Sequence, residues 1–357
     1  VIQRFGMSKP ALIHEAEKIT PDWLTEVLNF AGISGRVHSL TSKSIGTGQV
    51  GENVRFELKG EGELPESIVG KFASNDPVSK QTGVQLQNYI KEVFFYSELA
   101  ASVDIQTPVV HYADIIDETH DFAIIMEDLA PGEQGDQLNG CSVDDAALAL
   151  EELAKLHGPR WGDQSLGQYP LLAPRKVEEP DPAKSIYQMV QTGFLEKYAS
   201  RLGNADHEMV LGVGGVMDQY TDFTGEKTLI HIDYRLDNMM FGGPYPLAVV
   251  DWQSISLGCA FNDLSYFMGT SLLPDDRAEN EEALLKHYLD VLKSYGVEMK
   301  WNEAWALYRR YAPAGLIMAV IASMIVGETD RGNDMFMAMA TRSSQMSSEL
   351  ESLKVFG

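Results

Sequence analysis

Residues 229–241 read Leu-Ile-His-Ile-Asp-Tyr-Arg-Leu-Asp-Asn-Met-Met-Phe, and after one turn residues 247–253 read Leu-Ala-Val-Val-Asp-Trp-Gln. In the first stretch an apolar run leads to Asp233, and Asn238 follows five residues later. In the second stretch an apolar run ends at Asp251. The order places one candidate base and two candidate metal ligands next to predicted strands. We therefore take these two stretches as the centre around which the chain folds.

The three polar residues match the needs of phosphoryl transfer. Transfer of a γ-phosphoryl group from ATP requires a carboxylate that orients and deprotonates the acceptor hydroxyl, and oxygen ligands that hold Mg²⁺ against the phosphates. Asp233 fits the first role, and Asn238 and Asp251 fit the second. The alternative is an ordinary hairpin, because a Gly-Gly-Pro turn links the stretches and hairpin ends often carry Asp or Asn. The full order of residues favours the functional interpretation.

Composition restricts the class of protein. The 357 residues are 44% hydrophobic, which suits a soluble globular protein of about two lobes. The 28 Lys and Arg residues against 52 Asp and Glu residues give a formal net charge of −24, which disfavours nucleic acid as a partner. Two cysteines, Cys141 and Cys259, are too few for a disulfide framework or a cysteine-rich zinc site and favour a cytoplasmic setting.

No segment is predicted to target or span a membrane. Residues 1–6 lack the long apolar core of a secretory signal and are expected to be a remnant ahead of a native start at Met7. The most apolar stretch, residues 312–326, falls short of the ~18 residues that a membrane span needs. We predict that this stretch is a buried helix.

Gly46, Gly48 and Gly51 form a G-x-G-x-x-G pattern. The pattern alone is weak, because dinucleotide-binding folds and kinase phosphate loops share it. A dinucleotide fold requires a helix after the glycines, whereas residues 54–58 alternate with period two and predict a strand. The glycines therefore predict a hairpin that covers phosphates, with a merely flexible turn as the alternative.

Lys71 lies on a short apolar strand, residues 67–72, ahead of a predicted helix over residues 84–101. Taken alone, Lys71 would be an ordinary charge on an edge strand. The predicted inner side of the helix consists of Leu86, Ile90, Val93 and Phe94. Glu92 lies close to this stripe, while Glu98 is expected to face solvent. Kinases use a lysine and a helix glutamate in this order to hold the α- and β-phosphates, so we predict a Lys71–Glu92 pair.

Residues 108–116 and 122–126 predict a second hairpin, which ends in Glu127-Asp-Leu129. Glu127 and Leu129 are candidates to contact adenine through main-chain groups, and an ordinary loop is the alternative. Helices are predicted after this point, over residues 142–157, 183–202 and 207–220, from residue 261 onward, and over residues 279–295, 301–326 and 335–353. Asp263 is placed either to anchor the catalytic loop or to cap its own helix. His157 is expected to be a packed structural histidine.

These motifs resemble the aminoglycoside phosphotransferase-like small-molecule kinases, and within them the ecdysteroid kinase-like (choline kinase-like) branch. The similarity covers most of the chain. It is carried by the catalytic loop and by Gly51-Glu-Asn53, Lys91-Glu-Val-Phe-Phe-Tyr96, Glu127-Asp-Leu129, Ala154-Lys-Leu-His-Gly-Pro-Arg-Trp161 and Val250-Asp-Trp-Gln253. The resemblance marks Glu52 and Asn53 as part of the nucleotide loop.

The resemblance implies an α+β fold with two lobes, as in protein kinases. A nucleotide-binding lobe, an antiparallel sheet with a helix, is expected over residues 7–127. A mainly helical catalytic and acceptor-binding lobe is expected over residues 128–357. The resemblance also implies ATP or GTP with Mg²⁺, and phosphorylation of a hydroxyl on a small molecule.

One departure concerns the catalytic loop. The family usually has Gly between the His and the Asp, where this chain has Ile232. If that Gly provides a special backbone conformation, a β-branched residue disfavours it and the loop geometry could shift. The chemical groups are all present, so activity is expected.

Three alternative functions stay open at this stage. The first is a protein of the same fold that binds a nucleotide or metabolite without transferring phosphate. The second is an aminoglycoside or amino-alcohol kinase. The third is a metal-dependent hydrolase that uses His231, Asp233 and Asp251, although no further residue pattern completes its ligand set.

The C-terminal helices, where this family builds its acceptor site, indicate the acceptor class. Residues 301–346 contain few acids and many methionines, namely Met318, Met324, Met335, Met337, Met339 and Met346. Flexible thioethers adapt to bulky apolar ligands, whereas several ammonium groups require convergent carboxylates. We therefore predict an alcohol with substantial apolar surface rather than a polycationic aminoglycoside. The alternative is that these methionines fill the helical core.

Overall fold

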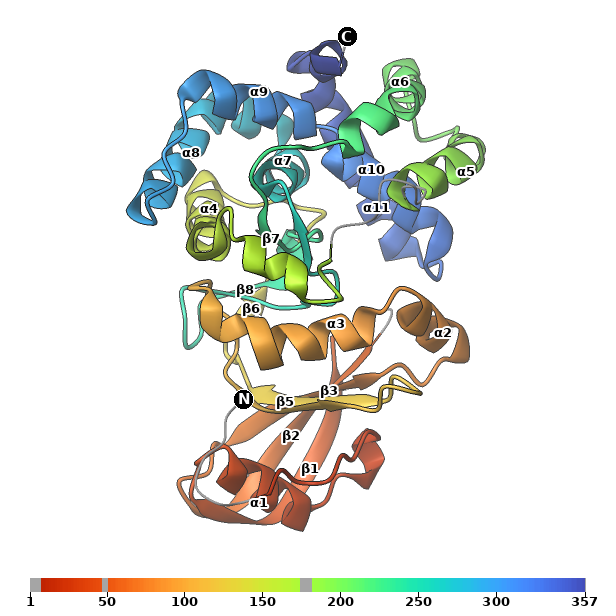
Figure 1. Ribbon diagram of the computed structural model, residues 1–357. Helices are drawn as coiled ribbons and strands as arrows, with labels where there is room; N and C mark the ends of the chain where they lie inside the picture. Colours follow the sequence, from red (N-terminus) through yellow and green to blue (C-terminus); the bar gives the residue numbers. More distant parts are fainter. Residues whose placement is uncertain (1–7, 47–50, 174–181, 357) are drawn as a thin grey trace. The chain divides into compact units, whose positions relative to one another are not determined.

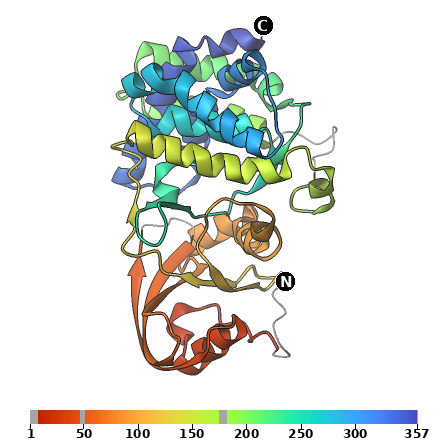
Figure 2. The same cartoon turned by 90° about the vertical axis from the view of Figure 1, so that its left-hand side faces the viewer.

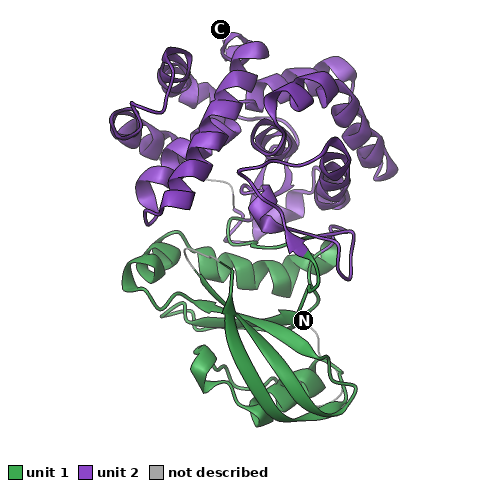
Figure 3. Cartoon of the chain, turned by 180° about the vertical axis from the view of Figure 1, so that it is seen from behind, with its two compact units in different colours: residues 1–102, 107–132, 248–254 green, residues 103–106, 133–247, 255–357 purple. Residues whose placement is uncertain are grey.

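The computed structural model describes residues 8–46, 51–173 and 182–356. The predictions on residues 1–6, Met7 and Gly48 lie outside these ranges. The chain forms two compact units (Figure 3), with residues 1–102, 107–132 and 248–254 in unit 1 and residues 103–106, 133–247 and 255–357 in unit 2. The segment that carries Asp251 therefore belongs to unit 1, not to the unit that follows the expected boundary at residue 127.

Unit 1 is built on an antiparallel sheet of five strands in the order β1-β2-β3-β5-β4 (Figure 1). The strands are β1 (Gly35–Ile45), β2 (Gly51–Gly62), β3 (Ser67–Ala73), β4 (Val110–Ile115) and β5 (Phe122–Glu127). Both predicted hairpins, β1–β2 and β4–β5, are confirmed. Side chains alternate along the central strand β3, so that Ile68 and Phe72 face one side of the sheet while Val69 and Lys71 face the other.

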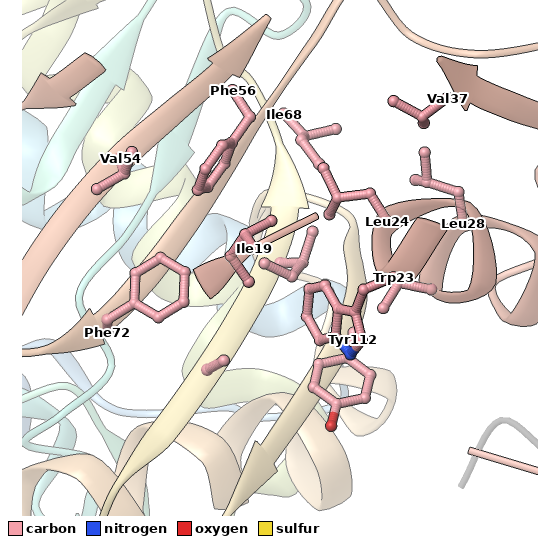
Figure 4. Close-up of a cluster of buried hydrophobic side chains, with 13 residues drawn as sticks. Ile19, Trp23, Leu24, Leu28, Val37, Val54, Phe56, Ile68, Phe72 and Tyr112 are labelled. Atoms are coloured by element: carbon pink, nitrogen blue, oxygen red, sulfur yellow. The ribbon is translucent and has the colours of Figure 1, made fainter. Parts of the chain in front are cut away.

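Helix α1 (Pro21–Phe30) covers one face of this sheet (Figure 1). It begins after Thr20, whose hydroxyl accepts a hydrogen bond from the Trp23 N–H at 3.2 Å. Ten of the buried side chains between α1 and the sheet are labelled in Figure 4: Ile19, Trp23, Leu24, Leu28, Val37, Val54, Phe56, Ile68, Phe72 and Tyr112. This apolar cluster fixes the sheet from one side.

The other face is covered by a helical segment that is less regular than predicted. The expected single helix over residues 84–101 is wrong, because the chain forms α2 (Pro77–Gln85), α3 (Asn88–Phe94), a π-helical turn (Phe95–Leu99) and a 3₁₀ turn (Ala100–Ser102). Gln87, at φ 59°, separates α2 from α3. Leu86 is exposed rather than inside, and Tyr89 takes its place by stacking on Phe122 at 4.9 Å between ring centroids. Glu98 is exposed, as expected.

Unit 2 is mainly helical. Its α-helices are α4 (Val143–His157), α5 (Pro182–Lys197), α6 (Asn204–Thr221), α7 (Ala260–Ser271), α8 (Pro274–Ser294), α9 (Trp301–Tyr311), α10 (Ala314–Ile325) and α11 (Asp330–Glu349). All residues of α7 except Asn262 are buried. Helices α4, α8, α9, α10 and α11 all contact α7 (Figures 1 and 2), which makes it the core of this unit.

The predicted helix over residues 301–326 divides into α9 and α10 because Pro313 cannot continue the helical hydrogen-bond pattern. The apolar stretch of α10 is largely buried, as predicted. Among the described residues, no helix is both long and apolar enough to cross a membrane. Both cysteines are free thiols.

Short strands and turns connect the helices of unit 2 and include the loop that carries Asp233 and Asn238. They are β6 (Glu133–Gln134), three 3₁₀ turns (Gly158–Arg160, Gln164–Gln168 and Leu236–Asn238), β7 (Thr228–Ile230), β8 (Met239–Phe241), β10 (Ser256–Gly258) and a C-terminal 3₁₀ turn (Ser352–Phe356). Strand β7 pairs with β10, and β6 pairs with β8. The chain passes from unit 2 into unit 1 within β9 (Leu247–Val249).

Candidate active site

Lys71 is the centre of the candidate site in unit 1. Its side chain is only 10% exposed, and its Nζ atom lies 2.7 Å from Oε2 of Glu92 and 3.1 Å from Oδ1 of Asp251. The predicted Lys71–Glu92 pair is therefore present. Strand β3 directs Lys71 toward the face covered by α3, which supplies Glu92. Two carboxylates thus share one buried ammonium, which leaves this cluster with an excess of negative charge.

The ion pairs determine the charge of Lys71. Burial by itself lowers the pKa of Lys71, but the carboxylates of Asp251 and Glu92 outweigh this effect and raise the pKa above its ordinary value. Burial also raises the pKa of Glu92, to about 7, against the opposing effect of Lys71. Because two carboxylates lie within 3.1 Å of Nζ, Lys71 is a charged ammonium at neutral pH.

Asp251 is held in place by its neighbour in the sequence. Trp252 is fully buried and stacks on Phe95 of the π-helical turn, with ring centroids 3.8 Å apart and an interplanar angle of 5°. Its indole N–H donates to the carbonyl of Val249 at 3.2 Å. Asp251 itself has φ 66°, a conformation that is uncommon outside glycine. The stack fixes the loop so that the carboxylate of Asp251 reaches Lys71.

The glycine-rich hairpin lies next to Lys71. A Cβ atom added at Gly51 would lie 3.2 Å from the carbonyl oxygen of Phe72 and 3.4 Å from Cε of Lys71, so a side chain there would be crowded. Gly46 has φ +74°, which also favours glycine. Asn53 is directly opposite Lys71 in the sheet and shares its face.

The structure separates Glu52 from the lysine cluster. Because side chains alternate along β2, Glu52 points to the opposite face from Asn53. Its carboxylate accepts hydrogen bonds from the hydroxyl of Ser44 at 3.1 Å and from the amide of Asn75 at 2.8 Å. A hollow of about 260 Å³ lies at this end of the hairpin and is lined by residues of β1, β2 and residues 74–76.

Glu127 and Leu129 lie at the end of β5. The N–H of Glu127 donates to the carbonyl of Val109 at 2.9 Å, and its Oε1 accepts from the Val109 N–H at 2.7 Å. The carbonyl of Leu129 accepts from the N–H of Gly132 at 2.8 Å. These two main-chain groups are therefore engaged within unit 1.

Asp128, which the sequence patterns did not single out, ties this segment to the sheet. Its carboxylate accepts hydrogen bonds from Arg55 at 2.9 Å and from the hydroxyl of Ser67 at 2.7 Å. Burial raises the pKa of Asp128, but the hydrogen bonds from Arg55 and Ser67 outweigh it, so the pKa lies below its ordinary value. The segment after β5 is thus attached to β2 and β3.

Asp233 and Asn238 lie together in unit 2. The Nδ2 atom of Asn238 donates to Oδ2 of Asp233 at 3.0 Å and to the main-chain carbonyl of Asp233 at 2.8 Å. Two residues that the sequence patterns missed complete the surroundings of Asp233: its Oδ1 accepts from Nε of Arg235 at 2.9 Å and from the hydroxyl of Tyr266 at 2.7 Å. Because Nδ2 of Asn238 is engaged, Oδ1 is the atom of this amide that can bind a metal ion.

The hydrogen bonds determine the charge of Asp233. Burial raises its pKa, but the guanidinium of Arg235 and the hydroxyl of Tyr266 outweigh burial, so the pKa lies below its ordinary value. Asp233 is therefore a carboxylate at neutral pH. A carboxylate in this position can orient a hydroxyl and receive its proton.

The loop that carries Asp233 is anchored by Asp263 of α7. Its carboxylate accepts hydrogen bonds from the main-chain N–H groups of His231 and Ile232, the latter at 2.9 Å. The anchoring role is thus confirmed, and the carboxylate makes no side-chain cap to its own helix. Ile232 has φ 71°, so the special backbone conformation expected for the family's glycine is present with isoleucine in it.

His157 is a packed structural residue, as predicted. It is fully buried, with Nδ1 2.7 Å from the hydroxyl of Tyr288 and Nε2 3.5 Å from Oδ2 of Asp263. Burial lowers the pKa of His157, which favours the neutral imidazole. Within residues 8–46, 51–173 and 182–356, no group of three or more His, Cys, Asp or Glu residues is arranged to hold a metal ion. This finding gives no support to the hydrolase alternative.

Several solved structures have folds similar to that of this chain. A candidate aminoglycoside phosphotransferase from Ralstonia eutropha has a TM-score of 0.53 and 17% identity, and the match covers 93% of this chain and 97% of that one. Spectinomycin phosphotransferase, solved with ADP and spectinomycin, has a TM-score of 0.50 and 12% identity over 94% and 99% of the two chains. The GDP complex of aminoglycoside 2'-phosphotransferase-IIIa has a TM-score of 0.50 and 14% identity over 86% and 93%. The protein-kinase-like fold, with its antiparallel sheet and helical second unit, is thereby confirmed.

The sequence comparison is more specific. Residues 183–300 match the sequence model of the Ecdysteroid kinase-like family, which confirms the resemblance inferred from the motifs. A comparison with curated proteins gave no match. The matched residues include the loop that carries Asp233 and Asn238.

Proposed function

We propose that this chain is an ATP-dependent O-phosphotransferase that transfers the γ-phosphoryl group to a hydroxyl of a small molecule. The observation that carries the proposal is the buried ammonium of Lys71 between the carboxylates of Glu92 and Asp251. A buried lysine with two anionic partners is suited to bind α- and β-phosphates while one partner turns to a metal ion. Glu92 would keep the lysine oriented. GTP is the alternative donor.

The residues in unit 1 would bind the nucleotide in the following way. Gly46, Gly48 and Gly51 would bring the hairpin backbone close to the phosphates, because glycines have no side chain to hold a ligand away from the backbone. Asn53 shares the face of Lys71 and would contact the same phosphates. Glu52 faces away and would support the hairpin through Ser44 and Asn75 rather than bind nucleotide directly. The segment from Glu127 to Leu129 would contact adenine through main-chain groups other than the Glu127 N–H and the Leu129 carbonyl, which already bond within unit 1.

The donor set fits a magnesium ion. The lysine cluster carries more carboxylates than ammonium groups, and carboxylate and amide oxygens are the ligands that Mg²⁺ prefers. Asp251 of unit 1 and Oδ1 of Asn238 of unit 2 are each proposed as an oxygen ligand for the ion, which would neutralise charge on the phosphates. Asp233 would accept the proton of the acceptor hydroxyl.

A coupled assay for ADP release with a panel of alcohols tests the proposal. We expect turnover by the wild type, and a loss of about 10²- to 10⁴-fold in kcat for Asp233→Asn, because that is the usual contribution of a general base. Asp251→Ala should also lose turnover while the fold stays intact by circular dichroism. The matched control is Asp290→Asn, which removes an exposed carboxylate on α8.

Two outcomes would contradict the assignment. Near wild-type kcat for Asp233→Asn on an identified acceptor would show that this carboxylate is not the base. Nucleotide binding without turnover of any acceptor would instead favour the alternative, a protein of this fold that binds a nucleotide or metabolite without transferring phosphate.

A further inference from the structure

We propose that Arg235 is a positioning residue which occupies Oδ1 of Asp233 and thereby reserves Oδ2 for the acceptor hydroxyl. This inference deepens the proposed phosphotransferase function and rests on it. It concerns a residue of the loop 229–241 to which the motifs assigned no role, since Arg235 acts through Asp233 rather than on the nucleotide.

The hydrogen bonds to Asp233 distinguish its two oxygens. A carboxylate oxygen has two lone-pair directions. Oδ1 accepts from Nε of Arg235 at 2.9 Å and from the hydroxyl of Tyr266 at 2.7 Å, so both of its directions are filled. Oδ2 accepts from Asn238 at 3.0 Å, and among the described residues no other donor to it is found. The remaining direction of Oδ2 is therefore the place where a hydroxyl can donate.

Arg235 is itself fixed by several contacts. Its Nη1 atom donates to Oδ2 of Asp237 at 2.7 Å and lies 3.1 Å from the sulfur of Met335. The side chains of Arg235 and Asp237 are 17% and 8% exposed. The rigid guanidinium plane therefore links two carboxylates of the catalytic loop in one geometry. The single ammonium of a lysine can keep the charge but cannot present the same spaced donors.

The selection of Oδ2 matters for the chemical step. The acceptor oxygen forms a bond to the γ-phosphorus while the bond from that phosphorus to the β–γ bridging oxygen breaks. The electron pair of the broken bond stays on the departing nucleoside diphosphate, and the hydroxyl proton passes to Oδ2 of Asp233. If Asp233 were free to rotate about its terminal bond, either oxygen could meet the hydroxyl and the reactive arrangement would be populated less often.

Arg331 of α11 provides a matched control. Its Nη1 and Nη2 atoms donate to the carboxylate of Asp237 at 3.1 and 3.2 Å, so it belongs to the same charge network as Arg235. Its hydrogen bonds in the structure reach Asp237 and not Asp233. Arg331→Met removes one guanidinium from this network and leaves every hydrogen bond to Asp233 in place.

The experiment compares Arg235→Met, Arg235→Lys and Arg331→Met in the ADP-release assay with an identified acceptor. For Arg235→Met we expect kcat to fall by about 10²-fold, the usual cost of a misplaced reacting group, with KM for ATP close to that of the wild type. Arg235→Lys should recover part of the loss, and added methylguanidine should partly rescue Arg235→Ala. Arg331→Met should keep kcat close to the wild-type value.

A structure of Arg235→Met tests the geometry without reference to turnover. We expect its Asp233 carboxylate to be rotated or to occupy two orientations. A carboxylate that stays in place, with Oδ1 still bonded to Tyr266, would overturn the inference.

The kinetic outcomes separate this inference from the proposed function. Wild-type kcat in Arg235→Met, together with an inactive Asp233→Asn, would overturn the positioning role and leave the function standing. Equal losses in Arg235→Met and Arg331→Met would show that the charge of the network, rather than the orientation of Asp233, is important, and would also overturn it. Failure of the wild type to phosphorylate any acceptor would overturn the function and this inference together.

Discussion

Ile232 occupies a backbone conformation that its side chain disfavours. A β-branched residue in the left-handed region costs of the order of 1–3 kcal/mol, and such strain persists only where the surroundings impose it. Here the carboxylate of Asp263 imposes it by binding two successive N–H groups of the loop, those of His231 and Ile232. The sequence indicated that isoleucine could shift the loop. The structure shows that the anchor keeps the conformation and that isoleucine adapts to it.

This strain can be measured by comparing Ile232→Gly with Ile232→Ala. Both variants lose the branched side chain, so the loss of packing largely cancels in the comparison. Glycine adopts φ +71° without strain, whereas alanine retains a cost of roughly 1–2 kcal/mol. We therefore expect the free energy of unfolding, from urea titration, to be about 1 kcal/mol higher for the glycine variant. Equal stability, or a more stable alanine variant, would show that the loop is not held at this φ in solution.

The buried ion pair of Lys71 and Glu92 joins strand β3 to helix α3. Removing Lys71 leaves the carboxylate of Glu92 buried without a cationic partner, and breaking a buried pair in this way typically costs about 3–5 kcal/mol. We expect Lys71→Ala to weaken nucleotide binding and to lower the free energy of unfolding. The double variant Lys71→Ala/Glu92→Ala should show less than the sum of the two single effects, because the residues act as one unit.

The control for this cycle is Lys43→Ala, which removes an exposed lysine from β1 of the same sheet. Its effects on nucleotide binding and on the free energy of unfolding should add to those of Glu92→Ala. Strict additivity between Lys71→Ala and Glu92→Ala would argue that the two side chains do not interact in solution.

Asp128 attaches the segment after β5 to β2 and β3, and its contribution should depend on pH. Its pKa in the folded chain is below the ordinary value, so the carboxylate stabilises the fold at pH above the unfolded pKa of about 3.9 and loses this effect as pH falls through the folded pKa. We expect Asp128→Asn to lower the free energy of unfolding at pH 7 by about 1.5–3 kcal/mol, the range for hydrogen bonds to charged groups.

The difference between wild type and Asp128→Asn should shrink below about pH 4 and vanish in stronger acid. Urea titrations of the wild type and of Asp128→Asn at several pH values measure this difference in the free energy of unfolding. A difference that is constant from pH 7 to the acid limit would mean that the loss arises from packing and not from the charge of Asp128.

The elements show which parts of the fold could be predicted from sequence. The hairpins followed from period-two alternation and the glycine turn, because these signals are local. The helix that carries Glu92 was predicted as one piece, since the left-handed Gln87 and the π-helical turn leave no clear mark in the apolar pattern. Pro313 marks the division between α9 and α10, although the apolar pattern predicted one helix across it.

The sequence likewise predicted some residues of the candidate site and missed others. The order of residues along the chain was enough to select Lys71, Glu92 and Asp251, which the structure brings together. It could not reveal the stack of Trp252 on Phe95, because that contact joins residues far apart in the sequence. Tyr266, from a helix that follows the catalytic loop, was hidden for the same reason. Arg235 lies two residues after Asp233 and could have been noticed.

At the scale of the whole molecule, the net charge of −24 suggests a cationic acceptor, but the charges close to the candidate base do not. In unit 2 the groups bonded to Asp233 and Asp237 include two guanidiniums, those of Arg235 and Arg331. These cations already neutralise the two carboxylates. A site for several ammonium groups would instead need carboxylates without cationic partners.

The methionines support the apolar prediction less than their number suggested. Four of the six, Met335, Met337, Met339 and Met346, are buried, so the alternative that they fill the helical core is correct for these. Met318 and Met324 of α10 are partly exposed. The prediction of an apolar acceptor therefore rests on Met318 and Met324. It also rests on the pairing of Asp233 and Asp237 with arginines.

We expect that an alcohol with substantial apolar surface is phosphorylated more efficiently than a polycationic aminoglycoside. Sterol-like, aryl and alkyl alcohols and kanamycin-like aminoglycosides should be compared by kcat/KM in one ATP-coupled assay at equal ionic strength, because salt weakens attraction between exposed charges. Met324→Glu places a carboxylate on α10, and it should reduce kcat/KM for the apolar alcohol without affecting KM for ATP. The matched control is Met189→Glu, which makes the same change at a strongly exposed position of α5. Efficient phosphorylation of aminoglycosides, with no turnover of the apolar alcohols, would overturn this choice of acceptor and leave the phosphotransferase proposal in place, because both acceptor classes offer the same hydroxyl to Asp233.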